Sequence, residues 1–232
     1  SAGDRVAIGA YYNDGTGEKA GHVRVYEYSN SSWTQIGSDI DGEAADDFSG
    51  KSVSMNSAGD RVAIGATRHD VQLNQTWVYN VGHVRVYEYS NSAWNQLGSD
   101  IIGEAALDYS GYSVSMNSAG DRVAIGSEEN NGTGDNAGHV RVYEYSNSSW
   151  TQLGSDIDGE AAGDLSGNSV SMNSAGDRVA IGAYYNDGTG DRAGHVRVYE
   201  YSSSSWTQIG SDIDGETALD FSGHSVSMNS AG

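Results

Sequence analysis

One segment of the sequence recurs at almost regular intervals. The string NSAGDRVAIG occurs around Ser57, Ser118 and Ser174, and shortened copies lie at Ser1 and Ser230. The spacings between these serines are 56, 61, 56 and 56 residues. Repeats of this length are typical of solenoids, propellers and other repeat arrays. The repeat therefore constrains the fold more than any single motif does.

Each repeat contains four short runs in which apolar and polar residues alternate. In the first complete set these runs are 51–56, 60–66, 82–90 and 94–101. Alternation with Val, Ile and Tyr, bounded by Gly, Asn, Ser and Asp, predicts β-strands. The turns NSAGD and SNSAW are short enough for antiparallel hairpins. Four-stranded antiparallel units repeated in this way predict the blades of an all-β propeller, and no helix is expected.

The two ends of the chain complement each other. The first repeat lacks its first strand, and HSVSMN at 224–229 has no second strand after it. We expect this last strand to complete the first blade and close a four-bladed β-propeller, which leaves no inner edge unpaired. The whole chain, 1–232, would then be one domain. Its expected blades are 222–232 plus 1–47, then 48–108, 109–164 and 165–221. A fragment of a larger propeller is the alternative.

The repeat also resembles a known family. Residues 48–66, FSGKSVSMNSAGDRVAIGA, followed by GHVRVYEY, resemble the FG-GAP repeat of integrin α-subunit propellers and of secreted microbial and algal proteins. The resemblance implies an extracellular adhesion or binding propeller without catalysis. Two features depart from it: the family's GAP reads GAY, GAT or GSE here, and the short NSAGD replaces its calcium loop. Calcium is therefore not expected at that position.

The charge of the chain is strongly negative. With 32 acidic and 12 basic residues the formal net charge is -20, which argues against nucleic acid and anionic membranes as partners. No apolar run is long enough to insert into a membrane. In the two middle strands of each repeat, acidic and basic residues are equal in number, so their charges cancel. The excess therefore belongs to the loops of one face, where the remaining bases are Lys19, Lys51, Arg68 and Arg192.

The loops between the last strand of one repeat and the first of the next are candidate calcium sites. In DIDGEAADD the acids alternate, and calcium prefers six to eight oxygen ligands on a flexible loop. The alternative is a solvated acidic turn whose Asp side chains bond backbone amides. The candidate ligands are Asp39, Asp41, Glu43, Asp47, Asp156, Asp158, Glu160, Asp164, Asp212, Asp214, Glu216 and Asp220.

Exposed aromatic residues and the residues that open the inner strands are candidate ligand contacts. Tyrosine pairs beside Asn and Asp suit sugar rings or a protein partner, and the second repeat instead has a longer aromatic loop. The residue after the Gly that opens each first strand differs between repeats and should line the mouth of the axial channel. The candidates are Tyr11, Tyr12, Tyr184, Tyr185, Trp77, Tyr79, Lys51, Tyr112, Asn168 and His224.

Two further residue types recur. A histidine begins the third strand of every repeat, which indicates a structural hydrogen-bonding role rather than a catalytic base or zinc ligand. N-glycosylation sequons would accept glycans in a secreted eukaryotic protein. The histidines are His22, His83, His139 and His195, and the sequons begin at Asn30, Asn74, Asn131 and Asn147.

Catalysis finds little support in the sequence. The similar acidic loops offer no pair of carboxylates in unlike environments, and there is no phosphate loop or Cys/His metal box. We therefore expect a non-enzymatic, extracellular propeller that serves adhesion or assembly through protein contacts. A glycan-binding module on the acidic, Tyr-rich face is one alternative. The other is a repeat unit of a filament, in which each first blade is completed by the last strand of a neighbouring chain.

Overall fold

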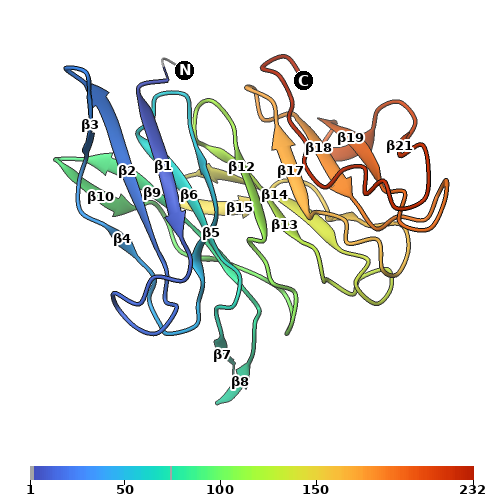
Figure 1. Cartoon of the computed structure of the whole chain (residues 1–232), viewed down its shortest axis with the longest axis horizontal. Helices are drawn as coiled ribbons and strands as arrows, with labels where there is room; N and C mark the ends of the chain where they lie inside the picture. Colours follow the sequence, from blue (N-terminus) through green and yellow to red (C-terminus); the bar gives the residue numbers. More distant parts are fainter. Residues whose placement is uncertain (1–2, 74) are drawn as a thin grey trace.

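The computed structural model describes residues 3–73 and 75–232. These ranges contain strands, turns and loops but no helix, and therefore no helix that could cross a membrane. Four antiparallel sheets stand side by side along the molecule, and a small two-stranded sheet projects from them (Figure 1). The predicted all-β architecture of antiparallel strands is confirmed.

Each large sheet contains one repeat. The first consists of β1 (Arg5–Ala10), β2 (His22–Ser29), β3 (Ser32–Gln35) and β4 (Ile40–Asp41). The second consists of β5 (Ser49–Met55), β6 (Arg61–Ala66), β9 (His83–Ser90), β10 (Ala93–Gln96) and β11 (Ile101–Ile102). The third consists of β12 (Ser113–Met116), β13 (Arg122–Ser127), β14 (His139–Ser146), β15 (Ser149–Gln152) and β16 (Ile157–Asp158). The fourth consists of β17 (Ser169–Met172), β18 (Arg178–Ala183), β19 (His195–Ser202), β20 (Ser205–Gln208) and β21 (Ile213–Asp214).

The outer strand of each sheet differs from the prediction. The run 94–101 forms two short strands, β10 and β11, and both pair with β9. The break falls at the GSD turn, where Asp100 accepts hydrogen bonds from Arg85 on β9 and from Gln96. A polar contact with the neighbouring strand thus interrupts the ladder. The inner strands begin and end within two residues of the predicted positions.

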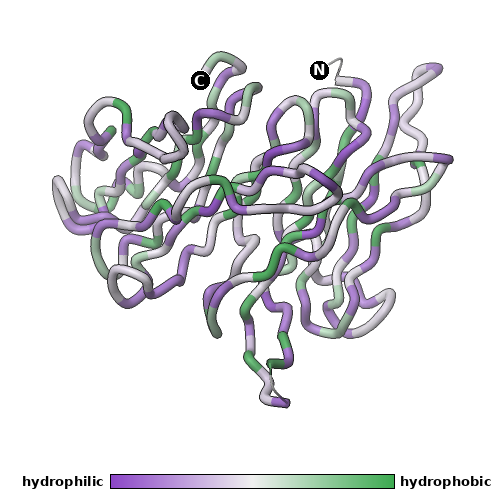
Figure 2. Tube along the Cα trace, turned by 180° about the vertical axis from the view of Figure 1, so that it is seen from behind, coloured by the Kyte–Doolittle hydropathy of each residue, from purple (hydrophilic) through white to green (hydrophobic). Residues whose placement is uncertain are grey.

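Hydrophobic residues form the contacts between neighbouring sheets. Hydrophobic and hydrophilic residues alternate along the strands in Figure 2, as expected for sheets that pack face to face. Three buried clusters result, one at each interface between consecutive sheets. In the first cluster, Val62 and Ile64 of β6 contact Val23 and Ile40 of the first sheet. Each sheet therefore depends on its neighbours for most of its core.

Hydrogen bonds from one sheet to the next repeat with the sequence. The indole of Trp94 donates to the carbonyl of Ile36 at 3.0 Å, and Trp150 and Trp206 make the same contact one and two repeats later. On the inner side, the Ser52 hydroxyl donates to the carbonyl of Gly111 at 2.7 Å. Trp94, Trp150 and Trp206 therefore lie at the interfaces between consecutive sheets.

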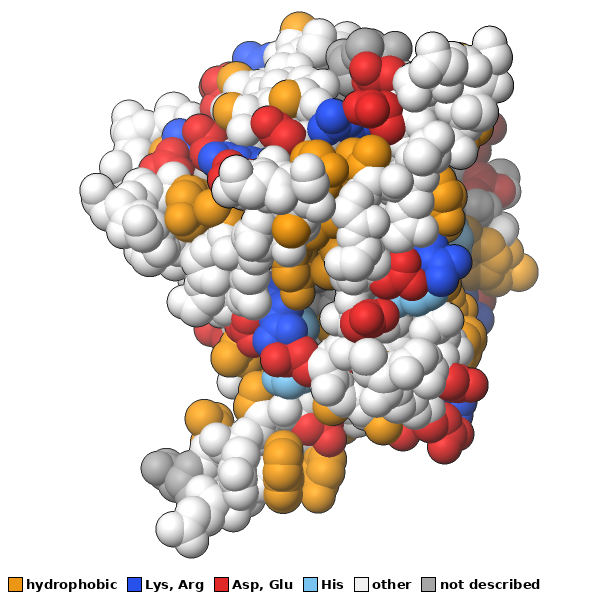
Figure 3. Space-filling model, turned by 90° about the vertical axis from the view of Figure 1, so that its left-hand side faces the viewer, with side chains coloured by type: hydrophobic (Ala, Val, Ile, Leu, Met, Phe, Trp, Pro, Cys, Tyr) orange, Lys and Arg blue, Asp and Glu red, His pale blue; other side chains and the backbone are white. Residues whose placement is uncertain are grey.

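The predicted ring closure is not part of this structure. In the described residues β1 pairs with β2 alone, and 224–229 form no strand. This segment instead lies beside the fourth sheet, where the amide of Met228 donates to the Ser171 hydroxyl. Val6 and Ile8 of β1 are consequently 37% and 51% exposed. Figure 3 views the molecule from the side of this first sheet, where hydrophobic side chains reach the surface.

Candidate functional site

A pocket of about 250 Å³ opens where the first three sheets meet. Its walls come from the segments that follow β1, β6 and β13 and from the residues around the starts of β5 and β12. We call it the aromatic pocket, because four of its ten lining residues are Tyr and one is Phe. The lining residues are Tyr11, Tyr12, Phe48, Lys51, Thr67, Arg68, Tyr109, Tyr112, Glu128 and Glu129.

Lys51 is held between two aromatic rings of this pocket. Its ammonium lies 5.2 Å from the centroid of the Tyr11 ring and 4.8 Å from that of Tyr112. A cation over the face of an aromatic ring is stabilised by the ring's quadrupole. Arg68 is placed in the same way, 4.4 Å from the centroid of Phe48. The pocket thus presents two cations on a molecule of net charge -20.

Glu128 is the buried carboxylate of the pocket. Its side chain is almost fully buried, and burial raises its pKa above the ordinary value of 4.5. The Asn168 amide donates a hydrogen bond to Glu128 at 2.8 Å, and this bond lowers the pKa, as does the charge of Lys51. The negative charge of Glu129 raises the pKa further. A carboxylate with a raised pKa is a stronger base once it is ionised.

The tyrosines near Glu128 stay protonated. Burial raises the pKa of Tyr112 to about 12, and the negative charge of Glu128 adds to this shift. Burial also raises the pKa of Tyr184, and the negative charge of Glu128 raises it further. Protonated tyrosines can donate hydrogen bonds to a ligand at any physiological pH. The pocket therefore combines a base, two cations and hydroxyl donors against aromatic walls.

The structure brings together five of the predicted contact residues. Tyr11, Tyr12, Lys51 and Tyr112 line the pocket, and Asn168 contacts its carboxylate. His224 lies outside it, with its ring centroid 5.2 Å from that of Tyr184.

The remaining candidates lie elsewhere. Tyr185 packs against Phe221 and beneath the guanidinium of Arg192. Trp77 and Tyr79 are more than half exposed on or beside the hairpin of β7 (Val71–Leu73) and β8 (Thr76–Val78), which projects from the large sheets (Figure 1).

Several acids of the predicted calcium loops bind arginines or backbone amides. Asp39 binds Arg24 of its own sheet, and this contact lowers its pKa to about 2. Glu43 binds Arg85 of the next sheet. Asp47 is buried and accepts the amide of Ala44.

The other loops repeat parts of this arrangement. Glu160 binds Arg197, and Asp164 accepts the amide of Ala161. Asp212 also binds Arg197, and Asp220 accepts the amide of Thr217. The guanidinium groups of the third strands therefore neutralise part of the loop charge that the sequence places on this face.

Groups of acidic and histidine side chains near these loops could hold a metal ion. There are four such groups among the described residues, and each includes a framework histidine. The framework histidines His22, His83, His139 and His195 are all buried. Their Nδ1 atoms face a carboxylate of their own sheet at 3.6 to 4.0 Å. The histidines therefore occupy polar junctions between sheets.

Two of the sequon asparagines lie in tight turns. Asn30 and Asn147 have φ near +50° at the turns that join β2 to β3 and β14 to β15. Asn131 accepts the amide of Asn136 with its side-chain oxygen. Asn74 lies outside the described residues. Glycosylation at these positions stays a prediction.

Two solved structures have a similar fold. One is a candidate 6-phosphogluconolactonase from Bacteroides uniformis, 10% identical with a TM-score of 0.57, where the match covers 83% of this chain and 48% of that one. The other is a periplasmic gluconolactonase from Pseudomonas aeruginosa, 12% identical with a TM-score of 0.53, covering 91% and 54%. This likeness shows the fold alone. The chain spans about half the length of either structure, and no family model and no curated protein matches its sequence.

These findings correct three expectations from the sequence. The FG-GAP resemblance is contradicted, because no family model matches and the structural neighbours carry the names of lactonases. The expectation of a non-enzymatic protein is contradicted for the same reason. So is the expected role in adhesion, filament assembly or glycan recognition. The repeat pattern predicted strands correctly, but strand periodicity is shared by many propellers and carries no information on function.

Glu128 is the candidate site residue that the sequence did not indicate. It occupies the repeat position that Tyr11, Thr67 and Tyr184 occupy in the other sheets, directly after the second strand. The sequence GSE in place of GAY or GAT marks this position. A carboxylate at a repeat position that holds Tyr or Thr in the other repeats was the available signal.

Proposed function

We propose that this chain is a hydrolase that opens a small cyclic ester of the sugar-lactone class in the aromatic pocket. The observation that supports this most is the buried carboxylate of Glu128, with its raised pKa, on the same pocket as the Lys51 ammonium. A base and a cation close to one another, in unlike environments, are the groups that ester hydrolysis requires. The names of the two similar structures support the same class of reaction.

The roles follow from the charges of the groups. Glu128 accepts a proton from a water molecule as the water oxygen attacks the lactone carbonyl carbon. Lys51 stabilises the negative charge that develops on the carbonyl oxygen. The ring C–O bond then breaks, and the leaving alkoxide takes the proton back from Glu128. The product is the open hydroxy acid, which releases one proton at neutral pH.

The walls of the pocket suit a polyhydroxylated ring. Tyr11 and Tyr112 offer aromatic faces, on which the C–H face of a sugar ring can pack. The hydroxyls of the tyrosines and the carboxylate of Glu129 can pair with ring hydroxyls. A volume of about 250 Å³ suits one small ring rather than an oligosaccharide.

The test measures acid release from glucono-1,5-lactone in a pH-stat, with the spontaneous rate subtracted. We expect catalysis by the unmodified chain and a fall in kcat of about 10²-fold or more for Glu128→Gln. Lys51→Met should lower kcat by a comparable factor, because the variant loses the contact with the developing oxyanion. Glu18→Gln is the matched control, because Glu18 is exposed outside the pocket and its carboxylate binds Lys19. A rate no faster than the spontaneous one, with phosphorylated and unphosphorylated lactones alike, would overturn the proposal.

Calcium binding by the acidic loops is a separate proposal. The alternating acids and the excess of negative charge support it. Because Asp39 and Glu43 already bind arginines, any calcium would have to use the exposed acids, such as Asp41, together with backbone carbonyls. An unchanged melting temperature after treatment with EDTA would contradict it.

Closure into a four-bladed ring is also kept as a proposal, together with an extracellular location. The sequence of 225–228, SVSM, is that of β12 and β17, which supports closure by pairing with β1. The proposed reaction does not depend on closure, because the aromatic pocket is built by the first three sheets.

A further inference from the structure

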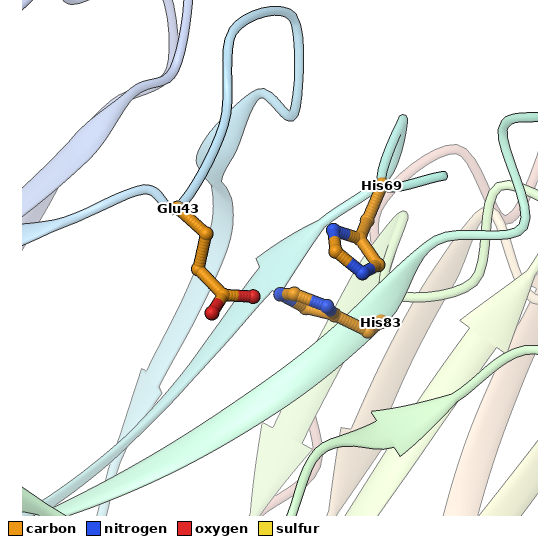
Figure 4. A group of neighbouring side chains, drawn as sticks. All are labelled: Glu43, His69 and His83. Carbon is orange, nitrogen blue, oxygen red and sulfur yellow. The ribbon is translucent and has the colours of Figure 1, made fainter. Parts of the chain in front are cut away.

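Two histidines and a glutamate meet where the first sheet packs against the second. Glu43 follows β4 of the first sheet, His83 begins β9 of the second, and His69 lies in the loop after β6. One nitrogen or oxygen of each side chain lies within 4.8 Å of the corresponding atoms of the other two. In Figure 4 a carboxylate oxygen of Glu43 points toward the ring of His83, and the ring of His69 lies beside it. The two ring centroids are 4.1 Å apart.

His83 carries a polar atom that nothing nearby satisfies. The residue is 3% exposed, and its Nδ1 has no hydrogen-bond partner among the described residues. The nearest carboxylate of its own sheet, that of Asp100, is 4.0 Å away. Burial lowers the pKa of His83 to about 3, so its imidazole is neutral at physiological pH. A buried nitrogen without a partner costs free energy, and a bound ligand would remove that cost.

His69 stands where other repeats have asparagine. The corresponding residues of the third and fourth sheets, Asn130 and Asn186, donate to the buried carboxylates of Asp108 and Asp164. His69 Nδ1 makes the equivalent contact with Asp47 at 3.3 Å.

This contact sets the tautomer of His69. Because an ionised carboxylate only accepts, His69 donates from Nδ1, and the lone pair stays on Nε2. A carboxylate behind a histidine is a usual outer partner of a metal ligand.

We propose that Glu43, His69 and His83 bind one divalent transition-metal ion, with Zn²⁺ as the reference ion. Two imidazole nitrogens and one carboxylate oxygen suit Zn²⁺, Co²⁺ or Ni²⁺ and are a poor set for calcium or magnesium. Metal–ligand bonds of about 2.1 Å place tetrahedral ligands about 3.4 Å apart, so the three side chains have to close in by about 1.4 Å at most. A tetrahedral ion with these three protein ligands has one coordination position left for a water molecule.

The surroundings of the three residues favour a cation despite one nearby arginine. Arg85 binds Oε2 of Glu43 and both oxygens of Asp100. Oε1 of Glu43 remains for a metal, and the ion pair holds the carboxylate in place. Glu43, Asp47 and Asp100 carry three negative charges against the single charge of Arg85. This site is distinct from the calcium proposed for the acidic loops, because it depends on nitrogen ligands.

The other three groups provide internal comparisons. They combine one histidine with two carboxylates, and the arginines Arg24, Arg141 and Arg197 bind the acids there. Only the second repeat adds a second imidazole, through His69 in the loop of 67–82. We therefore expect one tight site per chain for Zn²⁺ among the described residues.

The test titrates ZnCl₂ into the metal-free chain by calorimetry and follows the melting temperature with and without zinc. We expect one site per chain and a higher melting temperature with zinc, because an ion that binds the folded state stabilises it. His69→Asn should weaken binding at least tenfold and remove the thermal shift. It should keep the fold, because Asn occupies this position in the other repeats. His224→Asn, which removes a histidine outside the group, should change neither measurement.

Three outcomes would overturn the proposal. The first is that zinc produces neither heat nor a thermal shift in the unmodified chain. The second is that His69→Asn binds zinc with unchanged affinity and stoichiometry. The third is that the chain binds Ca²⁺ as tightly as Zn²⁺. None of these readouts involves hydrolysis. Failure of the metal site therefore leaves the proposed lactone hydrolysis intact, and the reverse also holds.

Discussion

At the scale of single residues, both proposed sites depend on positions where one repeat departs from the others. Glu128 replaces a tyrosine or threonine, and His69 replaces an asparagine. Both substitutions place a titratable group where the fold supplies a buried environment and a polar partner, Asn168 for the first and Asp47 for the second. The framework that the repeats share supplies the surroundings, and the exceptions supply the chemistry.

The raised pKa of Glu128 predicts the sign of a stability effect. A group whose pKa is higher in the folded state than in the unfolded state stabilises the fold at low pH, and this contribution is lost as pH rises through the folded pKa. Ionised Glu128 therefore destabilises the fold at neutral pH. We expect Glu128→Gln to raise the melting temperature at pH 7 and to change it little at pH 4.

Thermal melts at pH 4 and pH 7 would measure this effect. The acid limb of the lactonase rate should likewise lie above pH 4.5, the ordinary pKa of Glu. A larger loss of stability for Glu128→Gln at pH 7 than at pH 4 would contradict the assigned shift.

At the scale of elements, identical strands differ in what covers them. β1 and β6 share the sequence RVAIGA, yet Ile8 is 51% exposed and Ile64 is 2% exposed. The difference arises because the first sheet packs against β6, while no sheet of the described residues covers the corresponding face of β1. Val6, Ile8, Tyr26 and Trp33 line an apolar surface groove there.

This pair of isoleucines gives a matched test of the fold. Ile64→Ala should lower the free energy of unfolding by about 2–5 kcal/mol through lost burial and a cavity. Ile8→Ala should cost under about 1 kcal/mol, because half of its side chain already contacts water. Denaturant melts of both variants provide the measurement. Equal costs would mean that the face of β1 is covered in solution, as ring closure requires.

At the scale of the whole molecule, the four large sheets form an open series. Every hydrophobic cluster joins consecutive sheets, and none joins the first sheet to the fourth in the described residues. In such a series, stability is close to a sum of sheet and interface contributions. The inner sheets have two interfaces and the end sheets have one. The ends should therefore open more readily than the middle.

Hydrogen exchange can measure this difference on matched peptides. β1 and β13 both contain RVAIG, so their intrinsic exchange rates are nearly equal. In the part of the chain that the structure describes, β13 pairs with strands on both sides, whereas β1 pairs with β2 alone. We expect amides of β1 to exchange faster than those of β13, measured by mass spectrometry. Equal protection would indicate that 225–228 pairs with β1 in solution and closes the ring.

The repeat alone determined most of the secondary structure. Strand alternation placed the three inner strands of the second sheet to within two residues, and the turn residues placed its hairpins, whereas the strand expected at 224–229 did not form. Variation at the residue after the strand-opening Gly also indicated Lys51 and Tyr112, which the structure places at the aromatic pocket. These features are local, because pleat periodicity and turn conformation depend on residues close in the chain.

Contacts between distant residues were decided only by the tertiary structure. Asn168 reaches Glu128 across 40 positions, and His69 and His83 meet Glu43 from a neighbouring sheet. The pairing of the loop acids with arginines of the next sheet was equally hidden, so the sequence overestimated the free negative charge of that face. Burial raises the pKa of Glu128, and it leaves Nδ1 of His83 without a hydrogen-bond partner among the described residues. It is a property of packed sheets, which residue types and spacings alone do not encode.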